Sequence, residues 1–107
     1  MGLEKQYKTF HDFYPYYLSE HRNPTCRVLH FIGSTLVLVS LALALITKNA
    51  WWFAAIPVVG YGFAWIGHYF FEKNRPATFT YPLYSFIADW VMYAQLLMGK
   101  IPFNVRA

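Results

Sequence analysis

Hydrophobic and polar residues occur in long blocks along this chain rather than in short alternations. Residues 28–47 carry one imidazole and no formal charge, and residues 50–71 form a second apolar block with two tryptophans near its start. A helix rises about 1.5 Å per residue, so roughly 20 apolar residues span the ~30 Å hydrocarbon core of a membrane. The pattern therefore predicts two membrane-spanning helices that are joined by a short polar turn at residues 47–49.

Local signals mark where these two helices begin and end. Asn23 is a favourable N-cap and Pro24 suits the first helical position, which predicts the start of the first long helix. Pro76 follows the second block and disfavours helix at the residue before it. Pro57 and three glycines lie inside the second block, where they predict a kink or close packing against a neighbouring helix.

Two shorter segments flank this predicted hairpin. Residues 7–20 indicate an amphipathic, aromatic-rich helix or helix-turn that Pro15 interrupts, lying in the headgroup layer or packed on the other helices. Residues 82–99 indicate a C-terminal helix whose apolar run after Asp89 is too short to span. We expect that helix to be interfacial or re-entrant, with a third spanning helix as the alternative. The expected fold class is an all-α membrane protein in which residues 1–107 form one domain.

Composition and charge agree with this interpretation and give the hairpin an orientation. The chain is 57% hydrophobic and only 13% charged, whereas an ordinary soluble domain has about 25% charged residues. If the C-terminal helix does not cross, only Lys48 lies on the far side, and the positive-inside rule makes the near side cytoplasmic. The basic residues on the near side are Lys5, Lys8, Arg22, Arg27, Lys73, Arg75, Lys100 and Arg106. This distribution fits anionic lipid and not nucleic acid.

All four histidines fall on that same side of the predicted bilayer. His30 lies shortly after the first helix enters the membrane and His68 shortly before the second leaves it, while His21 lies at the surface and His11 on the preceding arm. Any one of them has an ordinary interpretation as a buried side chain bonded to a carbonyl. Their convergence in depth instead predicts a metal site, because neutral imidazole is the commonest metal ligand in proteins.

The residues by themselves leave the chemistry of this site open. Glu72 and Asp89 add carboxylates, and histidines plus a carboxylate with open positions suit a non-haem ferrous oxygenase, although zinc fits the same ligands. One alternative is proton transfer, in which His68 acts as a base and Glu72, four residues later, orients it. Another is a Cys26 nucleophile with His30 as its base. A non-enzymatic lipid-binding or scaffold protein needs no metal. Six aromatic residues are candidates for an apolar channel that admits a lipid-like substrate: Tyr61, Trp65, Tyr69, Tyr81, Tyr84 and Trp90.

Several short motifs in this chain resemble those of one known family. The most specific is the block from Gly67-His68 to Glu72-Lys73-Asn74-Arg75-Pro76-Ala77. The others are Tyr17-x-x-x-His21-x-Asn23-Pro24, His30-Phe31-Ile32-Gly33, Tyr81-Pro82-Leu83-x-Ser85 and Asp89-x-x-Met92. Together they resemble the short bacterial members of the Mpo-like family, over nearly the whole chain.

The resemblance implies an Fe(II)-dependent dioxygenase that uses O2 to shorten a 2-hydroxy fatty acid by one carbon, with release of CO2. The resemblance to bacterial members implies an inner-membrane protein, and the positive-inside rule predicts that its site lies on the cytoplasmic side. The implied iron ligands and catalytic residues are His21, His30 and His68. The implied further ligands or supporting residues are His11, Glu72, Asn74 and Asp89, and candidates for holding the substrate carboxylate are Arg22, Arg27, Lys73 and Arg75. A lipid hydrolase that uses zinc is a further alternative.

Overall fold

The computed structural model describes residues 7–103, and over that range it is all-helical without strands. Its elements are α1 (Phe10–Ser19), α2 (Pro24–Thr47), α3 (Trp51–Ile66), the π-helical turn η1 (Gly67–Glu72), the 3-10 turn η2 (Ala77–Phe79) and α4 (Pro82–Leu97). The prediction of an all-α fold is therefore confirmed for the described part of the chain. Lys5 and Arg106, which contribute to the predicted charge bias, lie outside the described residues.

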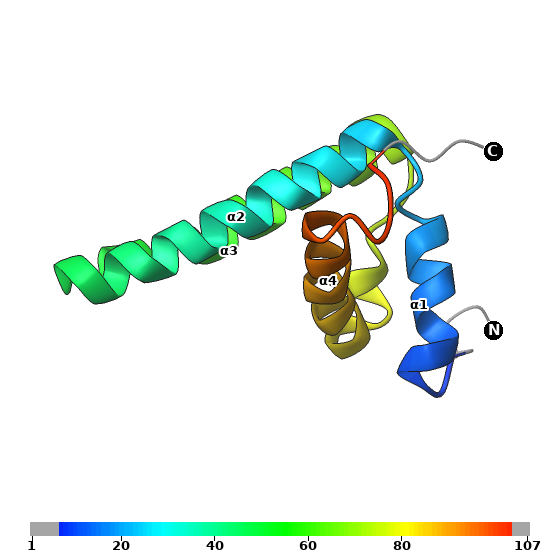
Figure 1. Ribbon diagram of the computed structural model, residues 1–107, viewed down its shortest axis with the longest axis horizontal. Coiled ribbons are helices and arrows are strands. Elements are labelled where there is room, and N and C mark those ends of the chain that lie inside the picture. The colour runs from blue at the N-terminus through cyan, green and yellow to red at the C-terminus, as the bar shows by residue number, and fades with distance from the viewer. Residues whose placement is uncertain (1–6, 104–107) are drawn as a thin grey trace.

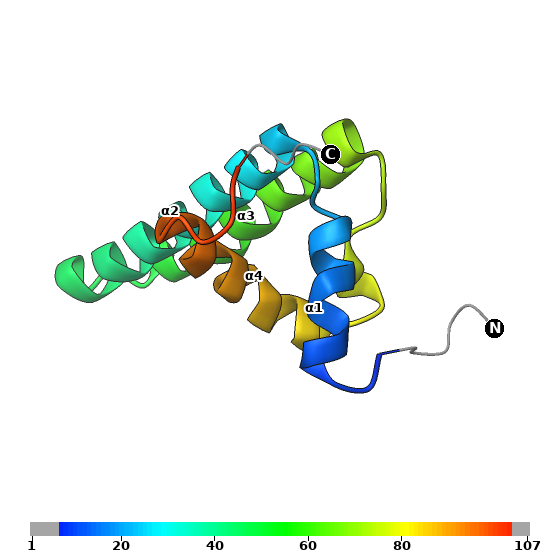
Figure 2. The ribbon, with the colours of Figure 1, turned by 45° about the vertical axis from the view of Figure 1, so that its right-hand side comes forward.

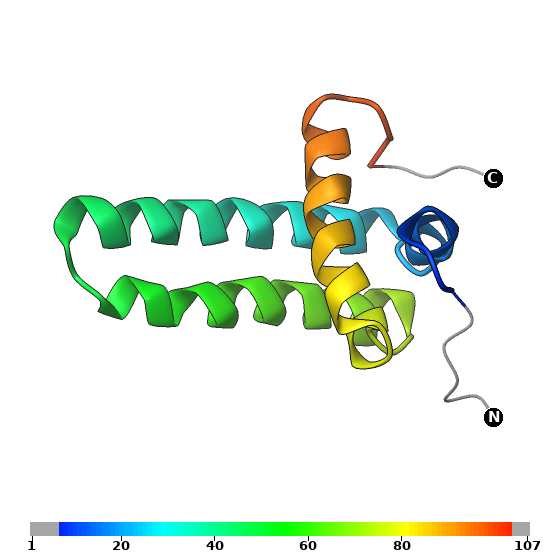
Figure 3. The ribbon, with the colours of Figure 1, turned by 90° about the horizontal axis from the view of Figure 1, so that it is seen from below.

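The two apolar blocks form a long antiparallel hairpin of α2 and α3 that projects from the rest of the molecule (Figure 1). The hairpin continues from α3 through η1, and its open end lies beside α1 and α4, which with η2 we call the head (Figure 2). Seen from below, α4 crosses both hairpin helices instead of running beside them (Figure 3). The head and the hairpin together extend over 45 × 31 × 26 Å.

Helix boundaries agree with most of the local signals, with one exception. The Asn23 side chain accepts hydrogen bonds from the backbone N–H groups of Thr25 and Cys26, at 2.8 and 3.3 Å, so α2 begins where predicted. The predicted interruption at Pro15 is wrong, because α1 continues through this residue. A proline removes one N–H donor from a helix, and here Phe13 and Tyr17, both fully buried, hold α1 against α4.

Most of the apolar surface of the hairpin is left uncovered by the part of the chain that the structure describes. Only 22% of the most apolar window of Pro24–Thr47 is buried, and 11% of that of Trp51–Glu72. The core helix of a soluble protein would be mostly buried, whereas these two long apolar helices are largely uncovered. Both meet the length and composition needed to cross a membrane. The most exposed large apolar side chains of the hairpin are Leu45, Ile46, Trp51, Val58 and Phe70.

The packed interior lies in the head. Phe13 and Tyr17 of α1 pack there with Ala88, Met92 and Leu96 of α4. Residues 10–19 are thus helical as predicted, and their aromatic face packs against another helix. Within the hairpin, α2 and α3 approach closely at Gly33, where an added Cβ would lie 2.9 Å from the Phe63 Cβ.

Candidate metal centre

Three of the four histidines meet at the junction of the hairpin and the head. His21 follows α1, His30 lies near the start of α2, and His68 lies in η1, and they are 1%, 7% and 2% exposed. Their rings are nearly perpendicular to one another, with centroid distances of 4.6, 4.4 and 5.1 Å. One ligand nitrogen from each lies within 4.8 Å of the others, so the three buried histidines are placed to bind a metal ion. His11 is exposed on α1 and lies apart from them.

The hydrogen bonds of these histidines determine which ring nitrogen carries the proton. Nδ1 of His21 lies 2.6 Å from the Tyr17 carbonyl oxygen, and Nδ1 of His30 lies 3.0 Å from that of Cys26. Nδ1 of His68 lies 2.7 Å from Oδ1 of Asn74. All three oxygens can only accept, so each neutral imidazole carries its proton on Nδ1 and a lone pair on Nε2.

Two of these lone pairs face each other. Nε2 of His21 and Nε2 of His68 are 2.9 Å apart, and with both rings protonated on Nδ1 neither of these nitrogens carries a proton to share. Such a pair is repulsive unless a cation lies between the nitrogens. Burial lowers the pKa of His21 well below its ordinary range, and the adjacent His30 and His68 lower it further, so a proton is disfavoured there. Two nitrogens about 2.1 Å from one ion, at an angle near 90°, are about 3.0 Å apart, which fits a metal.

The end of η1 positions His68 and its partner. Lys73 adopts a left-handed conformation with φ of 62°, which ends the π turn and lets the Asn74 N–H donate to the His68 carbonyl at 3.0 Å. The Asn74 side chain then reaches back to His68. Its amide nitrogen donates to the Glu20 carbonyl at 3.1 Å, which orients Oδ1 toward the imidazole. One asparagine therefore supports His68 and also holds the loop that carries His21.

The two hairpin helices are held together at the site by close contacts. The Glu72 carboxylate accepts a hydrogen bond from the Asn23 backbone N–H, and the Asn23 amide donates to the Phe71 carbonyl at 3.3 Å. Gly67 lies so close to α2 that an added Cβ would meet the Cys26 Sγ at 2.9 Å. Glu72 thus supports the framework and is not part of the histidine cluster. Cys26 Sγ lies 3.6 Å from His30 Nδ1, whose proton is directed to the Cys26 carbonyl.

None of the four basic residues predicted to hold a carboxylate lines the two cavities at this site. Arg27 is buried and donates from Nε to the His21 carbonyl and from Nη1 to the Pro102 carbonyl, both at 2.7 Å. Arg75 lies over the Phe79 ring, 4.9 Å from its centroid. Arg22 and Lys73 are exposed. Arg27 therefore fixes the His21 loop, a role that only the tertiary structure reveals.

The third side of the centre is formed by α4. Asp89 accepts a hydrogen bond from the Tyr17 hydroxyl, and Tyr17 also stacks on His21 at a centroid distance of 4.0 Å. Burial raises the pKa of Asp89 to about 6 even though the Tyr17 hydrogen bond lowers it, and burial also raises the pKa of Tyr17 well above its ordinary value. Asp89 was predicted as a ligand or supporting residue, and it lies beside the cluster with Tyr17 as its partner.

Ser85 is a residue to which the sequence assigned no role. It lies four residues before Asp89, on the same face of α4, and is 3% exposed. Its hydroxyl oxygen is buried and has no hydrogen-bond partner among the described residues. An unpaired buried hydroxyl costs about 1–3 kcal/mol. The four-residue spacing between Ser85 and Asp89 is the sequence signal that would have identified Ser85 as a candidate site residue.

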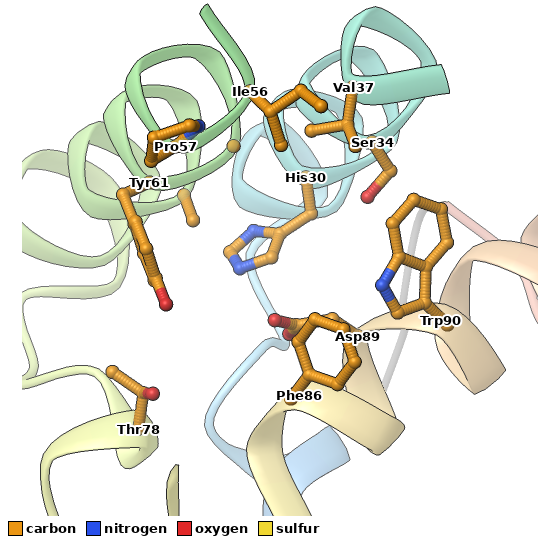
Figure 4. A pocket seen from close by; sticks show the side chains of 12 residues that line it. His30, Ser34, Val37, Ile56, Pro57, Tyr61, Thr78, Phe86, Asp89 and Trp90 are labelled. Carbon is orange, nitrogen blue, oxygen red and sulfur yellow. The ribbon is translucent and has the colours of Figure 1, made fainter. Parts of the chain in front are cut away.

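Two neighbouring cavities share one of the three histidines, His30. The smaller, about 20 Å³, is lined by the three histidines with Tyr17, Ser85 and Asp89 among others, and has room for about one water-sized ligand. The larger, about 200 Å³, lies between the hairpin and α4 (Figure 4). The two share the lining residues His30, Tyr61, Ala64, Thr78 and Asp89.

The larger cavity is mostly apolar and leads away from the centre. On α2 its lining runs from His30 to Val37, about 10 Å toward the hairpin tip, and Phe86 and Trp90 line it from α4. Of the predicted channel aromatics, Tyr61 and Trp90 line it and Trp65 lines the smaller cavity. Tyr81 and Tyr84 line a separate hollow beside Tyr7, and Tyr69 is exposed.

The fold and site define a small helical protein with a buried three-histidine cluster at the base of an apolar hairpin. Residues 7–101 match the family described as 2-hydroxy-palmitic acid dioxygenase Mpo1-like, and the chain belongs to this family. The predicted family membership is thereby confirmed. Comparisons with curated proteins and with solved structures gave no match.

The contact at Gly67 gives a prediction about metal affinity. Gly67→Ala would push η1 away from Cys26 and so separate His68 from His30, because the added Cβ has no room. We expect a several-fold weaker affinity for a divalent metal, measured by competition with a chromogenic chelator. Gly62→Ala is the matched control, since a Cβ there meets nothing within 4 Å. Equal affinities in both variants would contradict this role for Gly67.

Proposed function

We propose that this protein is an Fe(II)-dependent dioxygenase that shortens 2-hydroxy fatty acids by one carbon at a membrane surface. The observation that carries the proposal is the pair of Nε2 atoms of His21 and His68, which face each other 2.9 Å apart beside the third buried histidine, His30. The family description supports the choice of reaction and of substrate class. The ligand set would be His21, His30 and His68.

The ligand chemistry supports a metal with open coordination positions. Three neutral nitrogens leave positions for other ligands, and the cluster contains no thiolate that would favour a closed structural site. When bound, Fe(II) would supply the reducing electrons that let O2 react with an organic substrate. The same ligands accept zinc, so we base the choice of iron on the reaction that the family description names.

The proposed reaction breaks the C1–C2 bond of the substrate. A 2-hydroxy fatty acid and one O2 would give the fatty acid one carbon shorter, CO2 and water, in which all atoms are accounted for. The protein would contribute orientation and shielding. Asn74 and the carbonyls of Tyr17 and Cys26 hold the imidazoles in one tautomer, and the buried centre excludes bulk water.

The larger cavity would hold the first part of the acyl chain. It begins at His30 and Asp89, where the reacting carbons would lie, and it continues between apolar residues of the hairpin and α4. A volume of about 200 Å³ is small for a long-chain acid, so the distal chain would lie along the exposed hairpin surface. This arrangement suits a substrate that is itself dissolved in a membrane.

We further propose that the hairpin crosses the bilayer and that α4 lies at the interface, since α4 crosses the hairpin (Figure 3). The site would then lie just inside one surface. Of the described basic residues, Lys48 lies at the hairpin tip. Arg22, Lys73 and Arg75 lie in the loops at the open end of the hairpin, and Lys100 follows α4. The positive-inside rule supports a cytoplasmic head, in a bacterial inner membrane.

The direct test is turnover by purified protein in detergent or lipid vesicles. Protein prepared anaerobically and loaded with Fe(II) is mixed with 2-hydroxypalmitate and O2. We expect O2 uptake, CO2 release and the fifteen-carbon acid in equal amounts, with about one iron per chain by mass spectrometry. Zinc as the retained metal, with no O2 uptake, would favour the hydrolase. No retained metal of any kind would favour the non-enzymatic lipid-binding protein.

The acyl-chain assignment predicts a change in chain-length preference. Gly60 lines the larger cavity, and a Cβ there would already lie 3.2 Å from a Val37 methyl group. Gly60→Leu would fill part of the cavity, so kcat/KM should fall about tenfold for 2-hydroxypalmitate, equivalent to ~1.4 kcal/mol. The kcat/KM for a short 2-hydroxy acid should fall much less. Gly62→Leu lies outside the cavity and should change neither value; a uniform loss in both variants would contradict the assignment.

A further inference from the structure

Two polar residues of α4 face the histidine cluster across the small cavity. Ser85 and Asp89 are four residues apart and both line the cavity that contains the three histidines. The Ser85 hydroxyl is buried and has no partner among residues 7–103, whereas Asp89 accepts a hydrogen bond from Tyr17. A ligand bound at the centre would therefore have imidazoles on one side and this pair on the other.

The pair suits an alcohol group better than a carboxylate. An alcohol oxygen can accept a hydrogen bond from the Ser85 hydroxyl, and its own proton can be donated to the Asp89 carboxylate. A second carboxylate would meet the negative charge of Asp89, and none of the four basic candidates lines either cavity to offset it. The polarity of the α4 face thus matches the one group that separates a 2-hydroxy acid from a simple fatty acid.

We infer that Ser85, together with Asp89, recognises the 2-hydroxyl of the substrate and that Ser85 is a specificity-determining residue. This inference rests on the proposed function, since it concerns the same site. A site that hydrogen-bonds a substrate hydroxyl rejects the analogue that lacks it, because buried polar groups are then left unpaired. The Ser85 hydroxyl is such a group in the free protein.

The experiment measures binding without turnover. Detergent-purified protein loaded with Fe(II) is kept anaerobic, and the dissociation constants of 2-hydroxypalmitate and palmitate are measured by displacement of a fluorescent fatty acid. The wild type should prefer the hydroxylated acid. Ser85→Ala should reduce that preference about tenfold while retaining about one iron per chain, because Ser85 is not a metal ligand. Ser85→Cys replaces the hydroxyl with a slightly larger thiol that is a weaker donor, so its preference should lie between those of the wild type and Ser85→Ala.

Ser40→Ala is the matched control, because Ser40 is also a buried serine but lines neither cavity. It should leave the preference unchanged. An unchanged preference in Ser85→Ala would overturn the inference and leave the proposed function standing. Loss of iron in Ser85→Ala would also overturn it, since the residue would then belong to the metal site. Equal binding of both acids to the wild type, with or without iron, would overturn the proposed function itself.

Discussion

Replacing His68 with alanine is expected to abolish stoichiometric metal binding and, with it, oxidation of 2-hydroxypalmitate. His68 offers one of the three converging nitrogens, and its Nε2 lies 2.9 Å from that of His21. Removing this ligand leaves two nitrogens, so the loss of metal affinity should exceed the ~10–100-fold loss that is typical when a residue supporting a ligand is replaced. Metal content by mass spectrometry and O2 uptake measure the two losses. His21→Ala and His30→Ala should behave in the same way.

The fourth histidine provides the matched control for this series. His11 is exposed on α1 and lies outside the cluster, so His11→Ala should retain metal and activity. Helical content by circular dichroism should be similar in all four variants, because the hairpin depends on apolar surface and not on the cluster. Full activity in His68→Ala would overturn the ligand assignment. Metal loss in His11→Ala would require a different ligand set.

Replacing Asn74 with alanine is expected to weaken metal affinity about 10–100-fold, although Asn74 is not itself a ligand. Its Oδ1 accepts the Nδ1 proton of His68 at 2.7 Å, and its amide nitrogen donates to the Glu20 carbonyl beside His21. Without it, the His68 proton is free to move to Nε2, where it blocks metal binding. Competition with a chelator of known affinity gives the loss.

Rescue by aspartate separates the two functions of Asn74. Asn74→Asp retains an acceptor for His68 but cannot donate to the Glu20 carbonyl, so metal affinity should recover in large part. Asn49→Ala is a suitable control, because Asn49 accepts the Trp51 N–H at the hairpin tip, far along the chain from the histidines. It should leave metal affinity unchanged. Equal affinity in Asn74→Ala and the wild type would contradict the positioning role.

Features that depend on local sequence were predicted well. The Asn23 cap, the start of α2 and the two long apolar helices each follow from a few adjacent residues or from an uninterrupted apolar stretch. The interruption predicted at Pro15 failed because local propensity was outweighed by packing of Phe13 and Tyr17 in the head. The depth of α4 in a membrane stays a prediction.

The candidate site was predicted only as a set of residue types at similar depth. Sequence spacing in a hairpin places His30 and His68 near one surface, but it does not say which ring nitrogens converge. The supporting roles of Asn74, Arg27 and Glu72 arise from contacts between segments that are six to seventy-five positions apart. The channel assignment was likewise partial, because packing of the hairpin against α4 decides that Tyr61, and not Tyr69, lines the larger cavity.

By itself, the sequence determined that the chain is helical, that it carries two long apolar helices, and that it belongs to a family named for a fatty-acid dioxygenase. These follow from composition, periodicity and short motifs, which are properties of the chain before it folds. The tertiary structure decided that three histidines and not four converge, that their lone pairs point inward, and that the Ser85 hydroxyl beside them has no hydrogen-bond partner within residues 7–103. Such features depend on the directions of side chains from different helices, which become defined only when those helices pack.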